Sequence, residues 1–186
     1  MFELYITDRH NCNGDFLTRI AYLASLRPHG IILREKDLQE DEYLELAKKV
    51  LPLCRTHDAH CILHSFVNVA RRLECHSIHL PMESLRRLSC EERGFFSTLG
   101  ASCHSVEEAI EAENLGCTYV TAGHVFPTKC KDGVPPRGLD FLRNVCHAVR
   151  IPVYALGGMT EENRPLALSA GAAGVAVMSL GMTIPF

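Results

Sequence analysis

Eight short apolar runs, spread along almost the whole chain, constrain its fold more than any other feature of the sequence. Each run is rich in hydrophobic residues on both alternate positions, as expected for a strand in a sheet that is covered on both faces. The runs occupy residues 2–7, 30–34, 61–64, 77–80, 96–102, 119–123, 152–156 and 174–178. They predict a sheet of eight strands.

Longer segments with a helical period separate these runs. They occupy residues 15–26, 41–54, 67–73, 82–89, 105–116, 138–149 and 160–171. Two of them begin at a capping residue, Ser105 and Thr160, and two end at a glycine, Gly116 and Gly171. Strands that alternate with helices in this way predict a parallel sheet with right-handed crossovers.

Eight is also the number of strands that closes a (β/α)₈ barrel, which normally takes about 200–250 residues. This chain has 186 residues, and only the letters SLGMTIPF follow the eighth run. We therefore predict an α/β fold, a TIM (β/α)₈ barrel with the eighth helix missing or truncated, as a single domain over residues 1–186. A doubly wound open sheet is the alternative, but its dinucleotide-binding turn GxGxxG is absent from the sequence.

Charge and composition exclude several classes of function. The net charge is −3 with neutral histidines, and no long basic run is present, so we expect no nucleic-acid partner. No stretch has the roughly 20 apolar residues of a membrane helix, and the first residues do not resemble a secretory signal. Nine cysteines, an odd number without a CxxC pair, indicate reduced thiols in a cytoplasmic protein and argue against structural zinc.

In a closed barrel, ligands bind in the loops that follow the carboxyl ends of the strands. The motif ALGGMT places Gly157 and Gly158 after the seventh run, and VAVMSLG places Ser179 after the eighth. Paired glycines let the backbone approach an anion closely, and loops seven and eight often hold phosphate in this architecture. We predict a phosphate site there, more weakly at Ser179. A simple tight turn is the alternative for the glycine pair.

The motif LREK places Arg34 and Lys36 at the end of the second run. A guanidinium can bind a carboxylate or phosphate through two parallel hydrogen bonds, and an ammonium adds a point charge. The alternative is a surface ion pair of Arg34 with Glu35 or Asp37, which contributes little to stability. Spacing alone does not decide between these two interpretations.

The stretch TAGHVFPTKCKDG ends the sixth run with His124 and continues into a loop that contains Thr128 and Lys131. From the pattern alone, His124 is either a group aimed at a ligand or a polar residue at a strand end. If the strands are assigned correctly, His124, Lys131 and the cations after the second run converge on one mouth of the barrel.

Taken in order, the motifs LYITD, LREK, SCHSVEEA, GHVFPTKCK, IPVYALGGMTEEN and AGAAGVAVMS resemble the thiamine phosphate synthase superfamily. The resemblance runs from Leu4 to Ser179 and implies a TIM-type barrel that binds a phosphorylated thiazole in thiamin biosynthesis. The superfamily has two branches. Synthases join a pyrimidine diphosphate to thiazole phosphate with Mg²⁺, whereas TenI-like thiazole tautomerases move a proton without a metal.

The motifs favour the tautomerase branch at several positions. The Gln of the synthase pattern is replaced by Ile32, and the Asn-Asp pair that ends the third strand is replaced by His64 and Ser65. The second magnesium ligand falls in Pro81-Met82-Glu83, a changed context. GHVF with Thr128 and Lys131 resembles the tautomerase motif, in which the histidine is the proposed acid and base. A pKa near 6.5 suits that task.

We therefore predict a thiazole tautomerase, an isomerase that aromatises a carboxylated thiazole phosphate, with His124 as catalytic residue and no metal or other cofactor. The resemblance assigns His104 a binding or positional role, and His79 a structural one. A thiamine phosphate synthase, which would need Mg²⁺, and a noncatalytic ligand-binding relative are the alternatives. A truncated eighth helix leaves an apolar edge around Leu166, Val175 and Val177, so we expect a homodimer or the C-terminal tail to cover it.

Overall fold

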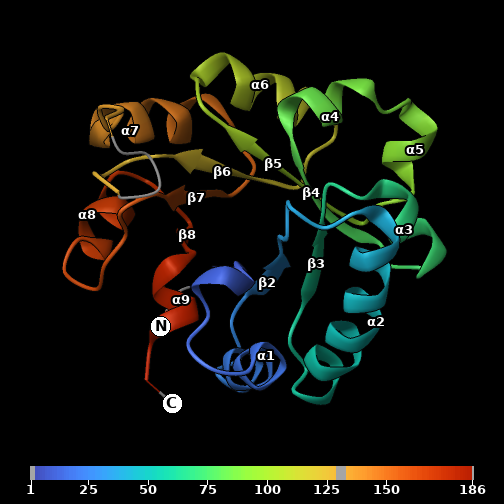
Figure 1. Cartoon of the computed structure of the whole chain (residues 1–186). Coiled ribbons are helices and arrows are strands. Elements are labelled where there is room, and N and C mark those ends of the chain that lie inside the picture. Colours follow the sequence, from blue (N-terminus) through green and yellow to red (C-terminus); the bar gives the residue numbers. More distant parts are fainter. Residues whose placement is uncertain (1–2, 129–132, 186) are drawn as a thin grey trace. The chain divides into compact units, whose positions relative to one another are not determined.

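The strands of the computed structural model, which describes residues 3–128 and 133–185, follow one another in sequence order around a closed barrel (Figure 1). Their bounds are β1 Leu4–Ile6, β2 Gly30–Leu33, β3 Cys61–His64, β4 Ser77–Pro81, β5 Thr98–Cys103, β6 Tyr119–Gly123, β7 Val153–Leu156 and β8 Gly174–Val177. All pairings from β1 to β3 and from β5 to β8 are parallel. The predicted (β/α)₈ barrel is confirmed.

A helix lies within or close to each interval that the helical period marks out. The helices are α1 Phe16–Ser25, α2 Glu40–Thr56, α3 Val67–Arg72, α4 Met82–Arg87, α5 Cys90–Gly94, α6 Val106–Asn114, α7 Gly138–Ala148, α8 Arg164–Ser169 and α9 Ser179–Thr183, with a 3₁₀ turn, η1, at Arg9–Asn11. The short helices α5 and α9 lie outside those intervals. The eighth helix is truncated, as expected: α9 has five residues. Among the described residues, every helix is too short or too polar to span a bilayer.

Local chemistry explains where several helices begin and end. The Ser105 hydroxyl accepts a hydrogen bond from the Glu108 N–H at the start of α6, and Gly116 ends that helix with a φ of 90°. Helix α8 begins at Arg164, four residues later than expected. Thr160 and Asn163 instead bond each other's backbone N–H groups in a turn that precedes Pro165, a residue suited to the first turn of a helix.

By its internal contacts, the chain divides into two compact units. The first comprises residues 1–78 and 177–186, and it contains β1 to β3 with α1 packed against α2. Its core includes Leu4, Ile31, Ile32 and Leu33, none of them exposed. The second comprises residues 79–176, in which β6 pairs with β5 on one side and β7 on the other.

The sequence predicts an exposed apolar edge near β8, but Val175 and Val177 are both buried. Within the first unit, the C-terminal segment lies close to the core. Met182 is fully buried, its carbonyl accepts a bond from the Asn13 N–H, and Arg19 donates to the Ile184 carbonyl. Leu166 remains half exposed in the second unit, and the homodimer stays a prediction.

Candidate functional site

The loops after β1 and β2 carry the cationic half of the candidate site, which lies in the first unit. Arg34 follows β2 and is half-buried, with Nη1 3.7 Å from Sδ of Met178. Its backbone N–H donates to Oγ1 of Thr7 over 2.9 Å. Lys36 is exposed. Thr7, the residue that follows β1, therefore holds the backbone of Arg34.

A buried carboxylate organises these loops. Glu35 is 2% exposed; its Oε1 accepts a 2.6 Å bond from the Thr7 hydroxyl, and its Oε2 accepts bonds from the backbone N–H and Nη1 of Arg9 at 3.1 and 3.2 Å. Arg9 also forks onto Asp37. Both acidic groups that could have paired with Arg34 bind Arg9 instead. We call Thr7, Arg9, Arg34, Glu35 and Asp37 the Glu35 network.

The outer end of the Glu35 network is charged and exposed. The hydrogen bonds from Arg9, and then from His10 at 2.9 Å, hold the pKa of the Asp37 carboxyl far below its usual range. The Asp37 bond in turn raises the pKa of Arg9 above its ordinary value. Arg9 is therefore a cation and Asp37 an anion near neutral pH.

A second buried hydroxyl joins the loops after β2 and β3. Tyr43 on α2 donates to the Leu33 carbonyl over 2.6 Å and accepts from the His64 N–H over 2.8 Å. Burial raises the pKa of Tyr43 well above its ordinary value, so the phenol keeps its proton. The role of Tyr43 and the hydrogen bonds of the Glu35 network were not predicted from the sequence, although Arg34 itself was. Helix patterning marks Tyr43 only as a core residue.

The loop after β6 carries the predicted catalytic histidine, in the second unit. His124 is 8% exposed, and its Nε2 lies 3.2 Å from the Val134 carbonyl oxygen, so it donates its proton there. Its main chain is also held: the His124 carbonyl accepts from the Arg137 N–H over 3.0 Å. These contacts fix the ring against the loop that leads into α7.

The paired glycines after β7 are required by packing. Gly157 and Gly158 have φ angles of 97° and 64°, which favour glycine. A Cβ added to Gly157 would overlap the Cβ of His124, and one added to Gly158 would lie 2.8 Å from the Phe126 carbonyl oxygen. We call Gly123, His124, Phe126, Gly157 and Gly158 the His124 turn. The tight-turn interpretation is thus sufficient for these glycines, and phosphate binding stays a prediction.

Two cationic or polar side chains meet at the Gly123 carbonyl oxygen, which begins the His124 turn. Nδ1 of His104 lies 2.9 Å from it, and Nε of Arg137 donates to it over 3.2 Å. His104 therefore bonds the residue that immediately precedes His124, so these two predicted site residues lie close together. Arg137 was missed, because its only signal was a charge in a loop rich in proline.

A row of polar side chains lines the inner face of the second unit's strands. Nε2 of His79 lies 2.8 Å from the Ser102 hydroxyl, and Nδ1 lies 2.9 Å from the Tyr119 hydroxyl. Ser102 pairs in register with Thr121, so their side chains lie on the same face. Thr121 is 1% exposed, and among the described residues its hydroxyl has no hydrogen-bond partner. Period-two alternation in runs 96–102 and 119–123 could have indicated these inward hydroxyls.

The remaining predicted site residues have different outcomes. Thr128 is half-buried at the end of the described part of its loop, whereas Lys131 lies outside the described residues. Ser179 is exposed at the start of α9 in the first unit. The second unit thus brings together His104, His124, Gly157 and Gly158, while Arg34, Lys36 and Ser179 belong to the first. Their convergence on one mouth stays a prediction.

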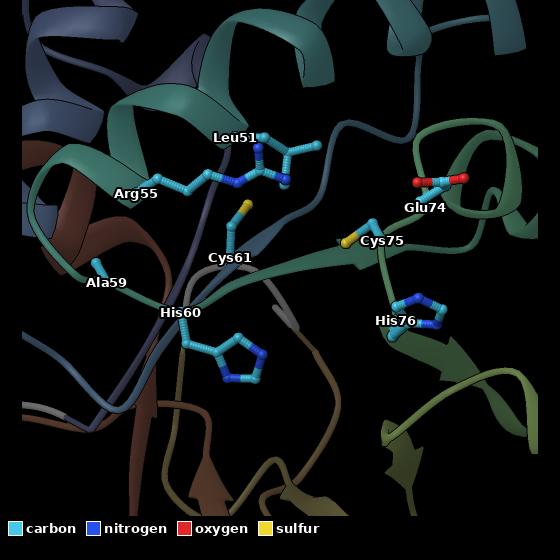
Figure 2. A pocket seen from close by; sticks show the side chains of 8 residues that line it. All are labelled: Leu51, Arg55, Ala59, His60, Cys61, Glu74, Cys75 and His76. Carbon is cyan, nitrogen blue, oxygen red and sulfur yellow. The ribbon is translucent and has the colours of Figure 1, made fainter.

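A cavity of about 210 Å³ lies elsewhere in the first unit, at the loops that precede β3 and β4 (Figure 2). Its lining includes Arg55, His60, Cys61, Cys75 and His76. The hydrogen bond with Cys54, followed by burial, raises the pKa of Cys61, and burial raises that of Cys75, so both thiols are neutral. In the described part of the chain, no three His, Cys, Asp or Glu side chains cluster as metal ligands. Because its lining residues lie before β3 and β4, the cavity is separate from the loops that follow the carboxyl ends of the strands.

Comparison with known proteins gives one family. The family described as thiamine monophosphate synthase matches residues 4–180. A putative thiamine-phosphate synthase 2 of Aquifex aeolicus is 33% identical over 94% of this chain and 94% of its own length. A thiamine-phosphate synthase of Roseiflexus is 37% identical over 97% of this chain and 78% of its own.

The solved structures agree with this result. Thiamine phosphate pyrophosphorylase from Pyrococcus furiosus superposes with a TM-score of 0.82 and 32% identity, covering 97% of this chain and 87% of its own. These names contradict the prediction of a thiazole tautomerase, an isomerase, and favour the synthase alternative, a transferase. The tautomerase prediction rests on the changed residues at the magnesium positions and on His124, and it gives too much weight to His124. Its contacts with Val134 and Gly157 show that packing alone can account for a histidine there.

Proposed function

Because the chain belongs to the thiamine monophosphate synthase family, we propose that it catalyses the synthase reaction, joining a pyrimidine diphosphate to a thiazole phosphate. A bond forms between the thiazole ring nitrogen and the pyrimidine-bearing carbon, and the carbon–oxygen bond to diphosphate breaks. The observation that carries this proposal is the identity of 33–37% to proteins named thiamine-phosphate synthase over 94–97% of the chain.

The substrates are anionic, so the protein must supply positive charge and backbone donors. We assign the diphosphate to Arg34 and Lys36, because a guanidinium binds phosphate oxygens in pairs and the Glu35 network fixes the Arg34 backbone. We assign the thiazole phosphate to the loop of Gly157 and Gly158, where both φ angles are positive and the backbone can approach an anion closely. Ser179, which belongs to the first unit, stays a predicted phosphate ligand. Lys131 and Thr128 would serve the same phosphate.

The pyrimidine ring needs polar partners at its nitrogen edge. Ser102 and Thr121 offer hydroxyls on the inner face, and His79 orients the Ser102 hydroxyl through a 2.8 Å bond. The buried Thr121 hydroxyl has no hydrogen-bond partner in the part of the chain that the structure describes, and so costs free energy unless another group approaches it. We therefore assign Thr121 and Ser102 to ring recognition, the step that sets specificity for the pyrimidine.

Unlike the tautomerase reaction, the synthase reaction does not move a proton between ring carbons. It therefore gives His124 no acid–base role. Its Nε2–H donates to the Val134 carbonyl, and its Cβ packs on Gly157. We propose that His124 orients the loop before α7, and that His104 and Arg137 hold the adjoining Gly123 carbonyl. All three are positioning residues in this scheme.

The superfamily's synthases use magnesium, and the residues at the corresponding positions of this chain can be compared with the ligands that the ion prefers. Mg²⁺ takes carboxylate and other hard oxygen ligands. The end of β3 offers His64 and Ser65, and the Glu83 carboxylate is 76% exposed and bonds Arg87 on the same helix. These residues do not fit a magnesium site, so we derive no step through the ion. Arg34 and Lys36 must then meet the charge of the departing diphosphate.

This misfit favours a second candidate function, a noncatalytic protein that binds a phosphorylated ligand. Its binding residues would be those assigned to the synthase, since the Glu35 network and the His124 turn do not depend on a metal. The difference lies only in turnover.

Incubation of the purified protein with the pyrimidine diphosphate and the thiazole phosphate distinguishes the two candidates. The synthase proposal expects equal molar amounts of thiamine phosphate and diphosphate, measured by thiochrome fluorescence and ion chromatography. Arg34→Ala should reduce the rate by about a hundredfold, roughly 2.7 kcal/mol of lost transition-state binding, and Lys48→Ala on the exposed face of α2 should not change it. Binding of thiamine phosphate without turnover at any Mg²⁺ concentration would favour the second candidate.

A further inference from the structure

The carboxylate of Glu35 is buried, yet both of its oxygens are bound. Oε1 accepts from the Thr7 hydroxyl at 2.6 Å, and Oε2 accepts twice from Arg9, at 3.1 and 3.2 Å. Taking a carboxylate out of water costs free energy that an apolar side chain would not. A leucine could fill the same space, so filling space does not explain the choice of a glutamate.

The geometry leads from this carboxylate back to the preceding residue. The Thr7 hydroxyl donates its one proton to Glu35 and so presents its lone pairs to the Arg34 N–H, 2.9 Å away. Thr7 is completely buried, so no water competes for these bonds. Glu35 thus sets the direction of the hydroxyl, and the hydroxyl sets the peptide plane of Arg34.

Arg9 closes the arrangement from the solvent side. Its guanidinium bonds Glu35 and Asp37 at once, and its side chain is 27% exposed. Because Asp37 lies two residues beyond Glu35, this bridge holds both ends of the segment Glu35–Asp37. Arg34 and Lys36 alternate with the two bound acids along the chain.

We propose that Glu35 is a positioning residue that, through Thr7, aims the Arg34 guanidinium at the diphosphate group of the substrate. The role of Arg34 as a diphosphate ligand rests on the proposed function. The role of Glu35 is to remove the freedom of the strand-end segment before the ligand arrives, which lowers the entropic cost of binding.

A double-mutant cycle tests this role, because it separates positioning from general stability. Binding of inorganic pyrophosphate is measured by calorimetry for the wild type, Thr7→Val, Arg34→Ala and the double variant. Thr7→Val keeps the shape of the side chain and removes the relay. We expect it to weaken pyrophosphate binding about tenfold in the wild-type background and less than about twofold with Arg34→Ala.

Three further variants keep the test independent of folding. Thr7→Ser retains the hydroxyl and should restore wild-type affinity. Glu35→Gln keeps one acceptor for Thr7 but presents an amide N–H₂ to the donors of Arg9, so it should weaken binding by a similar tenfold. Glu45→Gln removes an exposed carboxylate that accepts a 2.6 Å hydrogen bond from Lys48 on the same helix, and it serves as the matched control with unchanged affinity.

Equal losses from Thr7→Val in both backgrounds would overturn the positioning role, as would pyrophosphate binding that does not depend on Arg34. Failure of the proposed function looks different. In that case the cycle would show the same coupling, while the wild type would form no thiamine phosphate from the two substrates.

Discussion

Two buried threonines, one in each unit, differ in what their hydroxyls contact. Thr7 in the first unit is 0% exposed and both donates and accepts a hydrogen bond within the Glu35 network. Thr121 in the second is 1% exposed, and its hydroxyl finds no hydrogen-bond partner within residues 3–128 and 133–185. The loops around them are held differently too: side-chain hydrogen bonds fix the first, and close backbone packing at the His124 turn fixes the second.

This difference separates polar groups that shape a site from groups that meet a ligand. A buried hydroxyl such as that of Thr7 has already donated its one proton and is enclosed by protein, so its effect on a substrate must pass through its neighbours. An unsatisfied one costs about 1–3 kcal/mol in the free protein, a cost that a bound polar ligand removes. The comparison predicts opposite signs for the same substitution at the two positions.

The largest expected effect concerns the backbone packing of the second unit. Gly157→Ala should destabilise the protein by about 3 kcal/mol or more, because it combines a left-handed φ of 97° with overlap of the new Cβ and His124. The free energy of unfolding is measured by urea denaturation. Gly116→Ala is the matched control: its φ is 90°, but a Cβ would have open space, so about 1–2 kcal/mol is expected.

Similar losses in the two glycine variants would mean that conformation alone governs Gly157. The His124 turn would then lack the tight packing on which its role as a rigid support depends.

Thr7→Val tests the satisfied hydroxyl and should cost about 2 kcal/mol in the free protein. The reason is that the Glu35 Oε1 and the Arg34 N–H lose their partner while they remain buried. Thermal and urea unfolding measure the loss. Thr18→Val removes a hydroxyl that bonds Asp15 on the exposed start of α1, and should change stability by about 0.5 kcal/mol or less. Comparable effects at the two positions would contradict the buried relay.

Thr121→Val should have the reverse sign. Removing an unpaired buried hydroxyl leaves the free protein unchanged or more stable by up to about 1 kcal/mol. If Thr121 recognises the pyrimidine, the same variant should raise the KM for the pyrimidine diphosphate about tenfold and leave that for the thiazole phosphate unchanged. A clear loss of stability, equal to that of Thr7→Val, would show that the hydroxyl has an internal partner.

The fold could be predicted from the sequence because local pattern and global topology agree. Each of the eight apolar runs forms a strand, and each of the seven predicted helical segments contains a helix. What differed was local. The late start of α8 depends on a bond between Thr160 and Asn163, and the short α5 has little apolar periodicity to signal it.

The candidate site was only partly predictable, and the reason is physical. Strand-end position identifies Arg34, His104, His124, Gly157 and Gly158, since parallel strands place their carboxyl ends together. It does not reveal hydrogen bonds between residues that are distant in sequence, such as that of Thr7 to Glu35, 28 positions apart. Nor does a motif reveal whether a histidine is bound to a carbonyl, as His124 is, or faces a substrate.

The smallest expected effect concerns a polar pair at the other ends of the strands, which extends the comparison to a half-buried group. His60 lies 2.7 Å from the Ser77 hydroxyl, and burial, with the nearby His29 adding to it, lowers the pKa of His60 below 6.5. The unfolded chain then takes up a proton first as the pH falls. The free energy of unfolding therefore keeps the contribution of neutral His60 above pH 6.5 and loses it as the pH falls below that value.

His60→Gln removes this titration and keeps a partner for Ser77. Between pH 7 and about 5.5, the variant should lose less unfolding free energy than the wild type, by at most about 1 kcal/mol because the ring is partly exposed to solvent. Urea denaturation at a series of pH values measures the two slopes. Parallel slopes would mean that the ring gains and loses its proton as freely in the folded state as in the unfolded chain. The hydrogen bond to Ser77 would then not shield the half-buried His60 ring from solvent, whereas the Thr7 hydroxyl is fully enclosed.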